Sequence, residues 1–353
     1  MTNLVTIKGR KIGPDQPPYV IAEMSANHNG SLDRALAIIE AAHKAGAQAV
    51  KLQSYRADTI TIDHDGPEFI VHGGLWDGYR LYDLYEKAAM PWEWHEPLFK
   101  RGKELGIAIF SSPFDATAVE LLERLEAPAY KIASLELCDI PLIERVAKTG
   151  KPIVMSTGAS ELDEVKEAVA AARAAGAREL VLLHCTSGYP TPTRDSNLKT
   201  IPDLAQMFDA VIGLSDHTMG TAVPVAAVAL GAAVIEKHVT LRRADGGVDS
   251  AFSLEPEELE RMVADVNAAW EAKGKVFYGL AESERASRKF RRSLYVVQDL
   301  VAGQVIGMEH VRSIRPGLGL PPKHLKDVVG KRATRDVKRG TPLDWSMVDS
   351  PAR

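Results

Sequence analysis

Two histidines lie at the ends of short apolar segments that each read as a buried β-strand. His217 follows AVIGLSD, and His238 lies within AVIEKHVT. If these segments form neighbouring strands, the two rings can converge on one divalent ion. A lone histidine is more often a hydrogen-bonded core residue, but two at equivalent strand ends favour a metal site. Because no cysteine lies close to them in the sequence, we expect nitrogen and oxygen ligands with open positions, which suits Mn²⁺, with Mg²⁺ or Co²⁺ as alternatives, acting as a Lewis acid on a carbonyl oxygen.

Two lysines interrupt other segments that are otherwise apolar or small. Lys51 lies in AVKLQSY and Lys131 in AYKIASLE. A buried lysine needs an anionic partner, which is either an internal carboxylate such as Glu23 or Glu136, or the anion of a substrate. The chain contains neither GxGxxG nor GxxxxGK[ST], so a phosphate site would be built from dispersed strand ends.

Polar side chains recur in pairs at the ends of the predicted strands. Residues two apart on a strand point to the same side, and the residues between these pairs are mainly apolar. Because polar groups are costly to bury without partners, a shared functional site explains the set best. The pairs are Glu23 with Ser25, Lys51 with Gln53, Ser215 with His217, and Glu236 with His238.

Eight short apolar segments alternate with helical stretches, and this order predicts the elements that position those side chains. Eight strand-plus-helix units in about 250 residues are typical of an α/β fold, the (β/α)8 TIM barrel, whose active site lies at the carboxyl ends of the strands. A doubly wound open sheet rarely uses eight consecutive regular units. The predicted strands are Tyr19–Ser25, Ala49–Tyr55, Ile107–Pro113, Ala129–Glu136, Pro152–Gly158, Glu179–Cys185, Ala210–His217 and Ala233–Thr240.

The segment between the second and third predicted strands is unusually long. It reads DTITIDHDGPEFIVHGGLWDGYRLYDLYEKAAMPWEWH and would emerge at the catalytic face of a barrel. Its aromatic content disfavours disorder. We interpret its aromatic residues as loop and helix packing rather than as a stacking platform: Trp76, Tyr79, Tyr82, Tyr85, Trp92 and Trp94.

After about Lys275 the alternating pattern stops. The charged stretch GLAESERASRKFRR predicts a linker at residues 276–291, between a catalytic domain at 1–275 and a small β-rich domain at 292–353. The small domain contains an internal echo, DLVAGQVIGMEHV from Asp299 and DVKRGTPLDWSMV from Asp336, which favours two-fold pseudo-symmetry. At roughly 60 residues such a domain is marginally stable alone.

Composition argues against several other classes of protein. Forty-three basic residues against 47 acidic ones give a formal charge of −4, so we expect no nucleic-acid or anionic-membrane partner. Two cysteines, Cys138 and Cys185, exclude a disulfide framework, and Cys185 fits a small core thiol better than a nucleophile. No apolar run has the length of a signal peptide or a membrane span, and we therefore expect a cytoplasmic protein.

Together these segments resemble the sialic acid synthase family over nearly the whole chain, from about Pro18 to Asp349. The matching segments are IAEMSANHNG, VKLQSY, PAYKIAS, KPIVMSTG, LLHCTSGYPTP, GLSDHT, IEKHVTL and, in the tail, SIRPGLGL. The resemblance implies a transferase that joins phosphoenolpyruvate to an amino sugar through a new carbon–carbon bond. It also implies a barrel followed by a SAF (antifreeze-like) domain, and a domain-swapped homodimer in which that domain reaches over the partner's barrel.

The resemblance further implies roles for individual residues. His217 and His238 would hold the metal ion, and Glu23 or Glu136 would move protons. The residues implied around phosphoenolpyruvate are Lys51, Ser112, Lys131, Ser134, Ser156, Ser187 and Ser215, with Ser187 at a position that is usually Asn in the neuraminate branch. Those implied to face the sugar are Glu23, Gln53, Glu136, Tyr189 and Asp249, with Arg315 of SIRPG arriving from the partner subunit.

Within the family, IASLELCDIPLIERVAKTGKP resembles the pseudaminate branch, because neuraminate and legionaminate enzymes more often read GSGEC where this chain has residues 133–138. The implied sugar is 2,4-diacetamido-2,4,6-trideoxy-L-altrose, and phosphate is released. An N-acetylneuraminate or legionaminate synthase is the nearest alternative. A non-catalytic carbohydrate-binding protein that uses the tail domain is an alternative from a different class.

Overall fold

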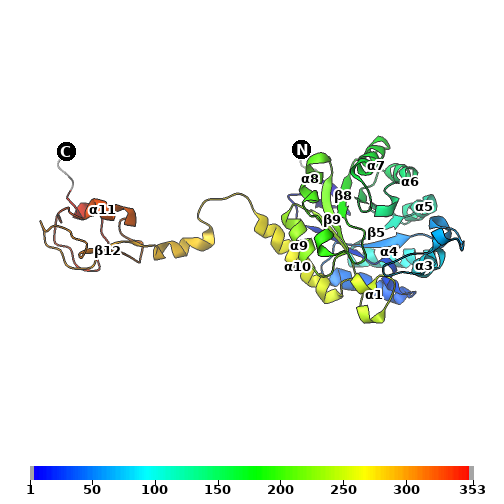
Figure 1. Cartoon of the computed structure of the whole chain (residues 1–353), viewed down its shortest axis with the longest axis horizontal. Coiled ribbons are helices and arrows are strands. Elements are labelled where there is room, and N and C mark those ends of the chain that lie inside the picture. Colours follow the sequence, from blue (N-terminus) through cyan, green and yellow to red (C-terminus); the bar gives the residue numbers. More distant parts are fainter. Residues whose placement is uncertain (1–3, 350–353) are drawn as a thin grey trace. The chain divides into compact units, whose positions relative to one another are not determined.

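The computed structural model describes residues 4–349, which form two compact units that meet between Gly274 and Lys275. The first unit is a closed barrel of eight parallel strands (Figure 1). Sequential strands are neighbours around the barrel, and the last pairs with the first, so the predicted (β/α)8 fold is confirmed. The strands are β3 (Tyr19–Glu23), β4 (Ala49–Ser54), β5 (Ala108–Pro113), β6 (Tyr130–Ile132), β7 (Ile153–Ser156), β8 (Leu180–Cys185), β9 (Val211–Asp216) and β10 (Val234–His238).

Helices surround this barrel, and the sequence marks where several of them begin. Ser31 accepts a hydrogen bond from the backbone N–H of Arg34 at the first helix, and Asp115 accepts from the N–H of Thr117 at a later one. Such caps satisfy N–H groups that lack partners within the helix. The helices that follow the strands are α1 (Leu32–Lys44), α4 (His95–Leu105), α5 (Ala116–Arg124), α6 (Ile140–Ala147), α7 (Leu162–Ala174), α8 (Thr200–Met207), α9 (Ala222–Ala229) and α10 (Pro256–Lys273).

Successive side chains of each strand point to opposite faces of the barrel, and this gives the unit two separate apolar cores. Outward side chains such as Ile235 pack against the helices, whereas inward side chains such as Val234 fill the barrel. An N-terminal hairpin of β1 (Val5–Ile7) and β2 (Arg10–Ile12) adds side chains to the inner core. Apolar residues therefore occupy the early positions of each strand and leave the carboxyl ends to polar groups.

One buried ion pair lies on the outward side of β10. The ammonium of Lys237 donates to Asp216 over 2.5 Å and also donates to the carbonyl of Thr218, and both charged side chains are almost fully buried. This pair ties β10 to the end of β9. Because Lys237 points outward, its neighbours Glu236 and His238 point into the barrel.

The long segment after β4 folds into short elements rather than an open loop. It contains α2 (Ala57–Ile60), α3 (Leu81–Ala88) and the 3₁₀ turns η2 (Pro67–Phe69) and η3 (Trp92–Trp94). Arg80 forms ion pairs with three carboxylates of the segment, from Asp63, Asp65 and Asp83. We call residues 57–94 the β4 insertion.

The second unit begins with an exposed 3₁₀ helix, η8 (Glu282–Phe290), within the predicted linker. A two-stranded antiparallel sheet follows, formed by β11 (Ser293–Val296) and β12 (Val311–Ile314), with α11 (Leu325–Val328), η9 (Pro322–His324) and η10 (Trp345–Met347). The unit has its own apolar core.

The internal echo of the tail corresponds to a reciprocal contact. Asp299 accepts from the backbone N–H of Arg339, three residues after Asp336, over 2.8 Å. Asp336 accepts from the backbone N–H of Ala302, three residues after Asp299, over the same distance. Leu300 and Val337 pair by backbone hydrogen bonds between the two copies.

Within residues 4–349, no helix combines the length and apolar character needed to cross a bilayer.

Candidate active site

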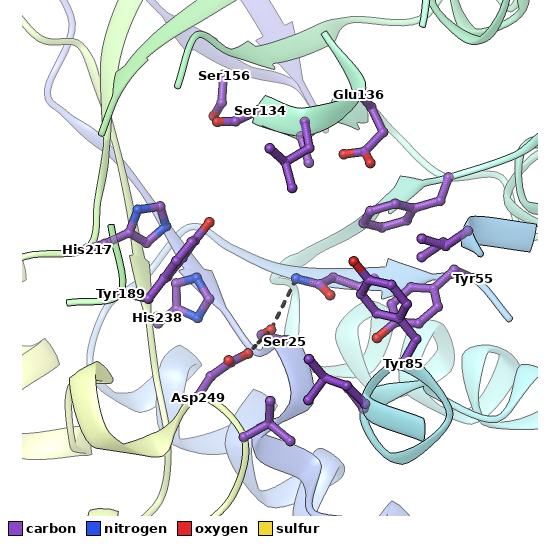
Figure 2. A pocket seen from close by; sticks show the side chains of 18 of the residues that line it. Ser25, Tyr55, Tyr85, Ser134, Glu136, Ser156, Tyr189, His217, His238 and Asp249 are labelled. Carbon is purple, nitrogen blue, oxygen red and sulfur yellow. Dashed lines mark hydrogen bonds between the residues drawn. The ribbon is translucent and has the colours of Figure 1, made fainter. Parts of the chain in front are cut away.

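A cavity opens at the carboxyl ends of the barrel strands, where barrel enzymes carry their chemistry (Figure 2). It brings together side chains from most of the strands and from the loops that follow them. Predicted site residues that line it are Lys51, Gln53, Lys131, Ser134, Glu136, Ser156, Tyr189, Ser215, His217, His238 and Asp249. Glu23, Ser112 and Ser187 contact this set, whereas Arg315 belongs to the second unit.

Two lysines and two glutamates form a buried charged cluster at the base of the cavity. The ammonium of Lys51 lies 3.1 Å from a carboxylate oxygen of Glu23 and 3.3 Å from one of Glu236. Lys131 lies 3.4 Å from the same oxygen of Glu236. Glu236 thus stands between the two ammonium groups.

Burial and the neighbouring charges move the pKa values of this cluster in opposite directions. Burial is the largest influence on Glu23 and raises its pKa to about 7, whereas for Lys51 the two carboxylates outweigh burial and raise the pKa. Burial lowers the pKa of Lys131. For Glu236, the two lysines outweigh burial and hold the pKa well below its usual range. Glu23 is therefore the carboxyl of the pair best placed to carry a proton near neutral pH.

The sequence suggested two glutamates as internal partners of the lysines, and the structure confirms only one of them. Glu23 is such a partner, but Glu236 rather than Glu136 is the other. The signal for Glu236 was present, since it shares a strand end and a strand face with His238. Both lysines also line the cavity, so internal pairing leaves them available to an anionic ligand.

Hydroxyl groups and one glycine surround the lysines. Ser112 Oγ lies 3.5 Å from the Lys51 ammonium, and Ser215 Oγ donates to Glu236 over 3.1 Å. Ser156 Oγ is buried and has no hydrogen-bond partner among residues 4–349. This hydroxyl is positioned to bind a ligand, because a buried polar group without a partner is unfavourable.

Gly158 was missed in the sequence and holds two serines close together. Its backbone N–H donates to Ser134 Oγ over 3.2 Å. A Cβ at this position would come 2.3 Å from Ser187 Oγ and 2.8 Å from Ser134 Oγ. A side chain at this position would displace both serine hydroxyls, so glycine allows Ser134 and Ser187 to stay close together.

His217 and His238 meet at one side of the cavity, on the adjacent strands predicted for them. Their ring centroids lie 5.2 Å apart. His217 Nδ1 donates to the carbonyl of Thr186 over 3.0 Å, which leaves Nε2 free to bind a ligand. Burial, followed by the charge of His217, lowers the pKa of His238 well below its usual value. Its Nδ1 is buried without a partner among the described residues.

This donor set fits a divalent cation that keeps open coordination positions. A neutral imidazole offers a lone pair, so Nε2 of His217 and the unpartnered Nδ1 of His238 can supply nitrogen ligands when both rings are deprotonated. Among residues 4–349, no group of three or more His, Cys, Asp and Glu side chains is arranged as a closed metal cage. The remaining positions would thus fall to oxygen atoms of water or substrate.

Cys185 lies beside this pair. Its sulfur is 3.9 Å from His217 Nδ1, and the thiol is buried, as a core cysteine would be. The sulfur also lies 3.9 Å from Ser187 Oγ, so the thiol packs between two predicted site residues.

A network of polar groups leads from the charged cluster to the cavity mouth. Gln53 Nε2 donates to Glu23 over 2.9 Å and to Ser25 Oγ over 3.1 Å, and Ser25 in turn donates to Asp249 (Figure 2). Burial raises the pKa of Asp249. The ring of Tyr189 lies 4.4 Å from that of His217, measured between centroids. These groups present amide, hydroxyl and carboxyl functions suited to a polyhydroxylated ligand.

The structure adds detail for five residues that the sequence patterns singled out. Glu136 and Ser134 lie in a 3₁₀ turn, η4 (Ser134–Glu136), because β6 ends at Ile132; both still reach the cavity, and burial raises the pKa of Glu136. Trp76 and Tyr85 of the β4 insertion pack against other aromatic rings, as interpreted from the sequence, and they also line the cavity. Arg315 is exposed and has no hydrogen-bond or ion-pair partner among the described residues.

Comparison with known proteins identifies the family of this chain. A profile described as "NeuB family" matches residues 38–278, and one described as "SAF domain" matches residues 291–349. Pseudaminic acid synthase of Campylobacter jejuni subsp. jejuni is 44% identical over 93% of this chain and 96% of its own length. Pseudaminic acid synthase of Helicobacter pylori is 40% identical over 95% of this chain and 98% of its own.

A solved structure supports the same family assignment. The N-acetylneuraminic acid (sialic acid) synthetase of Leptospira borgpetersenii serovar Hardjo-bovis superposes with a TM-score of 0.73 at 31% identity, over 81% of this chain and 95% of that one. The profile that covers more than half of the chain and the relatives that cover nearly all of it lead to one conclusion. The chain belongs to the NeuB family and carries a SAF domain at its C-terminal end.

Proposed function

We propose that this protein is a pseudaminic acid synthase, a transferase that condenses phosphoenolpyruvate with 2,4-diacetamido-2,4,6-trideoxy-L-altrose and releases phosphate. The observation that carries the proposal is the pairing, in one cavity, of a lysine and serine cluster with two neighbouring imidazoles. The first suits an anion with phosphate and carboxylate groups, and the second suits a cation that activates an aldehyde. The identity of 40–44% to pseudaminic acid synthases supports the choice of sugar.

In this proposal His217 and His238 hold Mn²⁺ or a similar divalent ion. When bound, the ion supplies Lewis-acid polarisation of the aldehyde oxygen at C1 of the open-chain sugar. Gln53, Tyr189 and Asp249 bind and orient the sugar along the network that leads to Glu23.

The reaction forms one carbon–carbon bond and breaks one carbon–oxygen bond. C3 of phosphoenolpyruvate attacks C1 of the sugar, water adds its oxygen to C2, and the C2–O bond to phosphate breaks to leave a 2-keto acid. Lys51 and Lys131 balance the charge on the phosphate and carboxylate, assisted by the hydroxyls of Ser156 and Ser215. Glu23 takes up or gives the proton that accompanies these steps, since its pKa lies near neutrality.

A substrate panel tests the proposal. Purified protein with Mn²⁺ and phosphoenolpyruvate is offered the altrose substrate, the corresponding legionaminate precursor or N-acetylmannosamine, and released phosphate and product mass are measured. We expect the altrose substrate to be used with the highest kcat/KM. A higher value for either other sugar would identify the alternative synthase, in line with legionaminic acid synthases at 33–35% identity. Absence of turnover with all three would favour a carbohydrate-binding protein.

The lysine cluster gives a separate prediction. Replacing Lys51 or Lys131 with Met should weaken phosphoenolpyruvate binding at least about tenfold, because a charge-assisted hydrogen bond to the anion is lost. Sugar binding should change much less, and Asp249→Asn should show the opposite pattern. Titration calorimetry with each ligand measures both effects. Unchanged phosphoenolpyruvate affinity in both lysine variants would mean that these ammonium groups serve only Glu23 and Glu236.

A further inference from the structure

One side of the active-site cavity is apolar, and the β4 insertion supplies it. The insertion residues that line the cavity with aliphatic or aromatic side chains include Ile60, Val71, Leu81, Leu84, Tyr85 and Ala88. Four charged residues of the insertion pair with one another instead, because Arg80 forms ion pairs with Asp63, Asp65 and Asp83. Within the described part of the chain, no charged side chain of the insertion lines the cavity. We call Ile60, Leu81 and Leu84 the apolar wall.

Packing and hydrogen bonds fix this side of the cavity in place. The ring of Tyr55 stacks edge-on to Phe114 at 5.1 Å and to Tyr85 at 6.0 Å, measured between centroids. Trp76 Nε1 donates to the carbonyl of Val248 over 3.0 Å, which joins the insertion to the loop after β10. Leu84 is only 7% exposed. The wall is therefore a preformed surface on which small differences in ligand shape have an energetic cost.

The wall lies away from the reacting end of the site. Figure 2 shows His217 and His238 on one side of the cavity, and Tyr55 and Tyr85, which frame the wall, on the opposite side. With the aldehyde carbon held near the histidines, the far end of the sugar chain extends toward the insertion. The carbon that meets the wall is then the one most distant from the aldehyde, C6.

A methyl group suits this surface, whereas a hydroxymethyl group does not. A methyl buries apolar area against leucine and isoleucine side chains. A hydroxyl at the same place would give up its hydrogen bonds to water, because aliphatic side chains offer neither donor nor acceptor. A hydrophobic pocket discriminates against an added hydroxyl by up to about 100-fold.

We propose that the apolar wall of the β4 insertion, Leu81 and Leu84 above all, selects sugars that carry a methyl group at C6 and disfavours those with a hydroxymethyl group. This specificity role rests on the proposed synthase function. It assigns to the insertion a part in substrate choice that is separate from the metal, the lysines and the proton-transfer groups.

The test compares two sugars that differ only at C6. The enzyme is given phosphoenolpyruvate, Mn²⁺ and either 2,4-diacetamido-2,4,6-trideoxy-L-altrose or its 6-hydroxy counterpart, and the ratio of the two kcat/KM values is measured. We expect wild type to favour the deoxy sugar by about 10- to 100-fold. Leu84→Asn and Leu81→Asn should each lower that ratio by about tenfold, mainly through KM. The control Leu162→Asn, on the exposed start of α7, should keep the wild-type ratio.

The outcomes separate this inference from the proposed function. A ratio near one in wild type, or an unchanged ratio in folded Leu81 and Leu84 variants, overturns the specificity role while leaving the synthase activity intact. Failure of wild type to use either sugar refutes the synthase function and the specificity role together. If Leu84→Asn does not fold, the half-buried Leu81 decides the question, with thermal unfolding and phosphoenolpyruvate binding as checks that its variant is native.

Discussion

Chelation should abolish turnover while leaving the barrel folded, and added Mn²⁺ should restore it. His217→Ala and His238→Ala should each lose the bound ion, because these two imidazoles lie side by side at the cavity and would supply its nitrogen ligands. Without the ion, nothing else in the described site supplies comparable polarisation of the aldehyde, so we expect activity to fall by about a thousandfold or more. Metal content by elemental analysis and phosphate release are measured on the same samples.

His184 provides the matched control for this experiment. It is also a buried barrel histidine, but its Nε2 donates to the carbonyl of Ser196 over 2.7 Å, and it does not line the cavity. His184→Ala should retain the ion even if it lowers thermal stability. Stoichiometric metal and full activity in both His217 and His238 variants would show that the pair is a hydrogen-bonded core feature.

Arg315 should complete the active site of a partner subunit. Its guanidinium is exposed and without a partner among residues 4–349, and it directly precedes Pro316 and Gly317 in the SIRPGLGL segment. Fork-shaped donors suit the acetamido and hydroxyl oxygens of the sugar, a geometry that a lysine does not copy. We expect Arg315→Ala to lower kcat/KM for the sugar by about 10- to 100-fold. Arg315→Lys should recover little of this loss, and deletion of residues 292–353 should lower sugar turnover more steeply while metal and phosphoenolpyruvate binding persist.

Mixing two impaired variants distinguishes action between subunits from action within one. In a mixed dimer of His217→Ala and Arg315→Ala chains, one barrel keeps its histidine and receives an intact arginine from the other chain. About half of the sites in each mixed dimer should therefore work, as expected for a closed two-fold exchange. Arg312→Ala, which removes an exposed cation of β12 three residues before Arg315, is the control and should leave activity unchanged. No recovered activity after demonstrated subunit exchange would rule out the swapped arrangement.

The barrel was predictable because its strands are buried on both faces. Segments such as Val211–Asp216 read as continuous apolar runs, and their period of two already separated inward from outward residues. That alternation predicts that Lys51, His217 and His238 face the same interior, and all three line one cavity. The end of β6 was not predictable in the same way, because no glycine or proline follows Ile132 to mark the turn that residues 134–136 form.

The parts of the site that the patterns missed depend on contacts between distant segments. Gly158 matters because the hydroxyls of Ser134 and Ser187 approach its α-carbon, and no local pattern reveals this. Trp76 lies in the cavity because its indole donates to a carbonyl of the loop after β10. Both effects arise from the closure of the barrel, which brings loops from different parts of the chain to one end.

Glu236 makes the charged cluster electrically self-contained in the absence of substrate. Its carboxylate touches both ammonium groups, and with Glu23 ionised the four buried charges cancel. Two buried ammonium groups without an internal carboxylate would bind an anion tightly and release it slowly. In this protein Glu236 can neutralise both ammonium groups when an anionic ligand leaves. In the proposed reaction, departing phosphate would leave behind a cluster that is already neutralised, so the internal carboxylates would lower the affinity for the anion and favour its release.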